Sequence, residues 1–127
     1  IKKRRILKGK GKATSFLAVN AAKDLINKKK LDPKTIDLVI VCTITPDFHG
    51  ASTAPSVATQ INASGSFAFD INAACSGFLF GMSTASSYIQ SGRYKKILLI
   101  GADMMSSIVD YSDRSTSILL EMELVQF

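Results

Sequence analysis

The feature that most constrains the fold is a set of three short apolar runs, spaced about thirty residues apart. They read DLVIVC at 37–42, FAFDI at 67–71 and KILLIG at 96–101. Runs of this length and character are typical of strands that are covered on both faces. Because helical patterns separate them, the sequence predicts right-handed βαβ units, a mostly parallel sheet and an α/β fold.

Three helices are expected around these strands. The first covers 13–30, with Thr14 or Ser15 as its cap. The second begins at Ser52 or Thr53, has Pro55 in its first turn, and is closed by the Ser-Gly pair at 64–65.

The third helix is expected over 77–90, with Gly92 as its stop. Helical spacing places four apolar side chains on one stripe, namely Phe78, Met82, Ala85 and Ile89. A polar, turn-rich segment follows at 103–115, and a last strand is expected at 116–120.

The charge of the chain is strongly uneven. Residues 1–34 hold twelve Lys and Arg against two Asp, whereas the remaining residues are net acidic. A solvated basic face and a site for a phosphorylated ligand or an acidic protein both fit this pattern. Nucleic-acid binding is not expected, because no aromatic residues interleave with the basic cluster and no binding motif is present.

The location of the protein is also constrained by its sequence. No apolar run approaches the ~20 residues that cross a bilayer, so no membrane association is expected. The basic start lacks the apolar region of a signal peptide, and two cysteines without such a signal indicate free thiols in a reducing compartment. We therefore expect a cytoplasmic protein.

Cys75 is the residue with the clearest chemical potential. It lies in DINAACSGF, between the strand at 67–71 and the helix at 77–90. A thiol at a helix N-terminus feels the positive end of the dipole, which favours the nucleophilic thiolate. A tight strand-to-helix turn also exposes the sulfur, and small neighbours leave room for a thioester. The alternative is a small buried apolar residue, which is the role we expect for Cys42 at the end of its strand.

Few other side chains offer catalytic partners. His49 is the single histidine, and pairing with Cys75 as a base is one alternative, while an ordinary polar surface residue is the other. Asp70 and Asp103 follow or end strands, where we expect hydrogen-bonding groups rather than a catalytic carboxylate pair.

The segment DINAACSGFLFGMSTASSYIQSGRYKKILLIGADMMSSIVDYSDRST resembles the β-ketoacyl-acyl-carrier-protein synthase III family, a group of condensing enzymes. AACSGF resembles the nucleophile turn of that family, and GADMMSS and DYSDRST resemble the segments after it. The resemblance covers 11–119 of a single half-domain at 1–127. It implies the thiolase-like αβαβα layered fold, of which this chain would be roughly the N-terminal βαβαβ half.

The resemblance also implies a function. Cys75 would accept the acyl group of an acyl-coenzyme A, with its backbone N–H in the oxyanion hole, and the acyl group would then be condensed with malonyl-acyl carrier protein. The family uses no metal or cofactor beyond its coenzyme A thioester substrate, and it forms homodimers. Alternatives are a fragment that only folds or dimerises, and a related enzyme such as a 3-hydroxy-3-methylglutaryl-coenzyme A synthase or a polyketide starter synthase.

The sequence departs from the family at three places. One is the segment at 49–52, which reads HGAS where the family usually has an aromatic-proline-serine segment that contributes to the acyl pocket. The family takes a histidine and an asparagine from its second half, and His49 does not match that histidine, so we expect this chain to be unable to condense. After DRST the family continues FGDGAGAV, whereas this chain ends LEMELVQF at 120–127. The codons TTT GGA GAT GGA GCT GGT GCA GTT, read one base later, encode that tail when a T follows. Our hypothesis is a frameshift that truncates the enzyme.

Overall fold

The computed structural model describes residues 6–7 and 9–113, and the strand expected at 116–120 and the tail at 120–127 lie outside this part. The helices are α1 (Thr14–Lys29), α2 (Ala54–Gln60) and α3 (Gly77–Gln90). The strands are β1 (Leu38–Cys42), β2 (Phe67–Ile71) and β3 (Ile97–Gly101). Three short 3-10 turns complete the fold, η1 (Pro33–Thr35), η2 (Ala74–Ser76) and η3 (Met105–Ser107).

The three strands form one parallel sheet in the order β2-β1-β3. Leu38 of β1 lies opposite Phe67 on one side and Ile97 on the other, so the three strands are in step. The central strand β1 is buried along its whole length, which explains its unbroken run of apolar residues. The predicted α/β architecture with a parallel sheet is confirmed.

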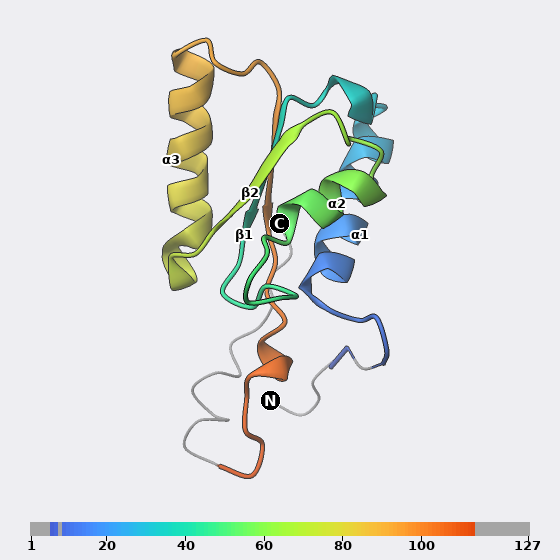
Figure 1. Ribbon diagram of the computed structural model, residues 1–127, viewed down its shortest axis with the longest axis vertical. Coiled ribbons are helices and arrows are strands. Elements are labelled where there is room, and N and C mark those ends of the chain that lie inside the picture. Colours follow the sequence, from blue (N-terminus) through green and yellow to red (C-terminus); the bar gives the residue numbers. More distant parts are fainter. Residues whose placement is uncertain (1–5, 8, 114–127) are drawn as a thin grey trace.

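Helices cover both faces of this sheet (Figure 1). Val39 and Val41 of β1 pack on one face with α1 and α2, and Leu38, Ile40 and Cys42 pack on the other face with α3. Since all strands run in the same direction, the loops that precede α2 and α3 gather at one edge of the sheet (Figure 1). Residues at the carboxyl ends of the strands therefore share this edge.

The caps of the first two helices differ from the sequence prediction. α1 begins after Ala13, not at Thr14 or Ser15, and no side chain of its own first turn caps it. The cap comes instead from Asp47, whose Oδ1 accepts a hydrogen bond from the Ser15 N–H at 2.9 Å. α2 does begin after Thr53, but its capping bonds come from Asp70, and the helix already ends at Gln60 rather than near 64.

The face that α3 presents to the sheet also differs from the predicted stripe. Gly77 and Gly81 are its buried residues, while Met82 is 52 % exposed and Phe78 and Ile89 are also exposed. Ala85, a member of the predicted stripe, does pack against the hydrophobic core. The stripe was wrong because the closest approach to the sheet is made through glycine, which carries no hydrophobic signal in a sequence pattern.

Among the described residues, no helix is both long and apolar enough to cross a membrane.

Candidate active site around Cys75

Cys75 lies where the sequence placed it, in the short turn η2 between β2 and α3. Its side chain is exposed, unlike that of Cys42. The turn leads directly into α3, which starts at Gly77 and runs for 14 residues, so the sulfur lies at the N-terminal end of a long helix.

The turn is held in an unusual backbone conformation. Ala74, next to Cys75, has a φ of 46°, in the left-handed region that costs an L-residue about 1–2 kcal/mol. The turn is closed by a hydrogen bond from the Ser76 N–H to the Ala73 carbonyl at 3.1 Å. Within the part of the chain that the structure describes, neither the backbone N–H of Cys75 nor its thiol has a hydrogen-bond partner. Strained conformations of this kind concentrate at functional sites.

Cys42 occupies a contrasting environment at the end of β1. It is 4 % exposed and packs beneath α3. Burial raises the pKa of the Cys42 thiol to about 11, and the carboxylates of Asp103 and Asp70 add to this shift. Cys42 is therefore protonated and inert at neutral pH, as expected for a structural cysteine.

The two strand-end aspartates bind backbone and hydroxyl groups. Asp103 follows β3, and its Oδ1 accepts hydrogen bonds from the Thr43 hydroxyl and the Ile44 N–H, both at 2.8 Å. Asp70 in β2 accepts from the Thr53 N–H at 2.6 Å and the Ala54 N–H at 2.8 Å. Both residues are the hydrogen-bonding groups that the sequence predicted, and they join loops to the sheet.

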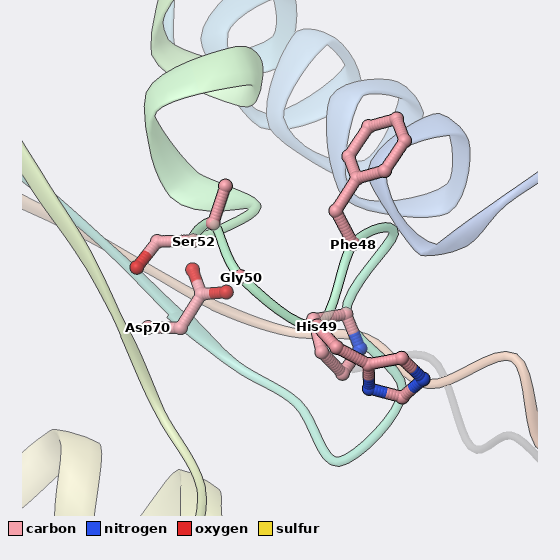
Figure 2. A pocket seen from close by; sticks show the side chains of 7 residues that line it. Phe48, His49, Gly50, Ser52 and Asp70 are labelled. Carbon is pink, nitrogen blue, oxygen red and sulfur yellow. The ribbon is translucent and has the colours of Figure 1, made fainter.

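His49 lies on the loop between β1 and α2, beside an open hollow of about 280 Å³. The hollow is lined by seven residues, which are Pro46, Phe48, His49, Gly50, Ala51, Ser52 and Asp70. Figure 2 shows the Asp70 carboxylate directed toward the loop, while the imidazole of His49 points away from it. His49 is exposed, and no hydrogen bond joins it to Cys75 within the described residues. The structure thus offers no support for a Cys-His pair.

One residue of this edge was missed by the sequence analysis. Asp47 joins the β1–α2 loop to the start of α1, and its partner Ser15 is more than thirty residues away. A cap supplied from such a distance has no local sequence signature, since the usual signal is a polar side chain at the first turn itself. In residues 6–7 and 9–113, no group of three or more His, Cys, Asp or Glu side chains could hold a metal ion.

Comparison with known proteins identifies relatives over nearly the whole chain. Residues 69–121 match the family model of 3-oxoacyl-[acyl-carrier-protein] synthase III. The chain is 51% identical over 116 residues to β-ketoacyl-[acyl-carrier-protein] synthase III 2 of Bacteroides thetaiotaomicron, which covers 91% of this chain and 35% of that protein. It is 50% identical over 119 residues to the synthase III of Chlorobium phaeovibrioides, and this match covers 94% of this chain and 36% of that protein. The chain thus spans about a third of the length of these relatives.

Solved structures show the same relationship. The 3-oxoacyl-[acyl-carrier-protein] synthase III of Aquifex aeolicus superposes with a TM-score of 0.85 at 44% identity, over 93% of this chain and 38% of that one. The priming β-ketosynthase of the R1128 polyketide pathway superposes with a TM-score of 0.82 at 31% identity. The match covers 90% of this chain and 34% of that one. The sheet and helices described above are accordingly part of a thiolase-like fold. About half of the aligned residues are identical to those of the curated relatives, so this chain is similar to about a third of a 3-oxoacyl-[acyl-carrier-protein] synthase III.

Proposed function

We propose that Cys75 is the acyl-accepting nucleophile of a 3-oxoacyl-[acyl-carrier-protein] synthase III, and that its acyl donor is an acyl-coenzyme A. The observation that carries the proposal is the exposed thiol of Cys75 in the strained turn at the start of α3. The second cysteine is buried with a raised pKa and offers no competing nucleophile. The names of the relatives supply the reaction class.

The acyl transfer uses the Cys75 thiolate, which attacks the carbonyl carbon of the thioester. The new bond joins Sγ to the acyl carbon, the bond between that carbon and the sulfur of coenzyme A breaks, and coenzyme A leaves with the proton that Cys75 gave up. The carbonyl oxygen carries negative charge between these events. The backbone N–H of Cys75, which has no partner among the residues that the structure describes, is one donor that would stabilise this charge. The loss of such a donor typically costs ~3–4 kcal/mol of barrier.

In the complete reaction the acyl group would be condensed with malonyl-acyl carrier protein, with loss of carbon dioxide, by a cytoplasmic homodimer. A polypeptide of these 127 residues alone supplies one histidine, His49, and this side chain is exposed at the hollow and points away from Asp70. We therefore propose that this polypeptide stops at the acyl-cysteine. A priming role in polyketide synthesis is the second candidate, because a priming ketosynthase superposes on 90% of the chain.

The test is incubation of the purified chain with acetyl-coenzyme A, followed by malonyl-acyl carrier protein. We expect release of one equivalent of coenzyme A per chain, no release from the Cys75→Ala variant, and no ketoacyl product. A folded chain that releases no coenzyme A would favour a fragment that only folds or associates. Ketoacyl product from the purified chain would contradict the proposed stop at the acyl-cysteine.

A further inference from the structure

The turn that carries Cys75 is fixed on both sides by contacts with the end of β1. Before the turn, the Thr43 N–H donates to the carbonyl oxygen of Ile71, the last residue of β2, at 3.0 Å. After the turn, the first half of α3 lies against Cys42, the last residue of β1. Two consecutive residues of the central strand therefore hold the strand that precedes Cys75 and the helix that follows it.

Glycine allows the close contact between α3 and Cys42. A Cβ built at Gly77 would lie 3.6 Å from the Cβ of Cys42, and a Cβ built at Gly81 would lie 2.5 Å from its Sγ. Gly77 and Gly81 lie about one helical turn apart, and both are buried. Because the contact is close-packed, the size of the Cys42 side chain sets how near the N-terminal half of α3 lies to the sheet.

The chain between these two fixed ends is short. Residues 72–76 alone connect Ile71 to Gly77, and their path includes Ala74 at a φ of 46°. An L-residue adopts this left-handed conformation at a cost, and keeps it only where the surrounding structure imposes it. A change in the distance between α3 and β2 would therefore be taken up in this turn, which also orients the backbone N–H of Cys75.

We propose that Cys42 is a positioning residue for acyl transfer: by holding α3 at a fixed distance from the sheet, its side chain keeps the backbone N–H of Cys75 aimed at the oxygen of the reacting acyl group. The inference rests on the proposed function, because it concerns the alignment of the turn that carries the proposed nucleophile. Cys42 itself is buried and forms no bond to the acyl group, so its effect passes through Gly77 and Gly81.

The test compares an enlarged side chain at Cys42 with a similar enlargement on the opposite face of β1. Cys42→Val adds a second branch at Cβ beneath α3. Val41→Ile is the control, because it adds one methyl group at the neighbouring buried residue, which packs with α1 and α2 instead. For each folded full-length variant, two rates are measured at Cys75, namely acetylation by acetyl-coenzyme A and alkylation by iodoacetamide.

The ratio of these two rates reports the alignment of the N–H donor. Acetylation passes through an oxyanion, whereas alkylation displaces iodide and forms no oxyanion. We expect Cys42→Val to lower the ratio of acetylation to alkylation by about tenfold or more, since complete loss of one oxyanion donor costs about 10²–10³-fold. Val41→Ile should leave the ratio unchanged, although overpacking destabilises both variants. An unchanged ratio in Cys42→Val, or an equal fall in both variants, would mean that Cys42 has only a structural role and would overturn the inference.

A change made from the side of the helix keeps the test decisive if Cys42→Val does not fold. Gly81→Ala brings a methyl group against the same sulfur and should lower the ratio, whereas Gly77→Ala makes an ordinary contact and should not. Adding Cys42→Ala to Gly81→Ala removes the sulfur and should recover part of the lost ratio. Equal ratios in all of these variants would overturn the inference. A loss that Cys42→Ala does not recover would assign the effect to Leu99, the other neighbour of Gly81, and would overturn it as well.

One outcome concerns the proposed function alone. If the unmodified folded chain is alkylated at Cys75 but never acetylated, the proposed acyl transfer is refuted, whatever the variants at Cys42 and Gly81 do.

Discussion

Replacing Gly81 by alanine tests how closely α3 approaches the sheet. A Cβ built at Gly81 would lie 2.5 Å from the Sγ of Cys42 and 2.7 Å from the Cδ1 of Leu99. Both neighbours pack beneath the helix, where Cys42 is buried and Leu99 is partly buried. Either the helix or these two side chains must therefore shift to accept a single methyl group.

The expected cost follows from two opposing effects. Overpacking a close-packed site costs about 1–3 kcal/mol, whereas a Gly-to-Ala change inside a helix gains up to ~1 kcal/mol from backbone entropy. With the full gain subtracted, we expect the free energy of unfolding to fall by about 1 kcal/mol, and by up to about 2 kcal/mol, in Gly81→Ala. Gly77→Ala is the matched control in the same helix, because its Cβ would meet the Cys42 Cβ at an ordinary 3.6 Å.

The assay is urea unfolding followed by far-ultraviolet circular dichroism, which reports the midpoint and the slope of the transition. Gly77→Ala should unfold at or above the midpoint of the unmodified chain. Adding Cys42→Ala to Gly81→Ala removes the sulfur contact, so the two changes together should cost less than the sum of their separate costs. A Gly81→Ala chain as stable as the unmodified one would refute the account of a glycine-mediated contact.

Three further predictions follow from single features of the chain. The pKa of the Cys42 thiol rises on folding from its ordinary 9.0 to about 11. The stability linked to its proton is therefore complete below pH 9.0, and the free energy of unfolding decreases by about 2–3 kcal/mol as the pH reaches about 11. Unfolding curves of Cys42→Ala should lack this part of the alkaline loss. Hydrogen bonds from the N–H groups of Lys95 and Lys96 lower the pKa of Asp37 below 3.8. The stability that this carboxylate provides is therefore present above pH 3.8 and is lost as the pH falls through its folded pKa. Acid unfolding of Asp37→Asn should lack that component, and an identical acid profile would contradict it. The frameshift hypothesis for 120–127 predicts that the gene reads FGDGAGAV in the neighbouring frame, and a gene sequence without this motif ends the hypothesis.

The strands and the order of the elements could be predicted from the sequence because the signal is local. The run at 37–42 is apolar throughout, and β1 proves to be buried at every position, so its composition directly reflects its place at the centre of the sheet. The position of Cys75 followed in the same way, since a turn between a strand and a helix is bounded by two recognisable elements.

The contacts that shape the site could not be predicted, because their partners are distant in the sequence. Asp70 caps α2 from 16 and 17 residues away, and Asp47 caps α1 from 32 residues away. The packing of α3 was missed for a related reason. Gly81 is buried because it has no side chain to hold the helix away from the sheet. A periodic pattern of large apolar residues instead indicates side chains such as that of Met82, which is exposed.

The central claim is that Cys75 carries the acyl group, and locating the acetyl group within the chain tests it most directly. The chain is incubated with acetyl-coenzyme A, quenched at acidic pH, digested and mapped by mass spectrometry. The account predicts one acetyl thioester on the peptide that contains Cys75, removable by hydroxylamine, and none on the peptide that contains Cys42. An unlabelled Cys75 in a folded chain, or labelling of equal extent in Cys75→Ala, would contradict it.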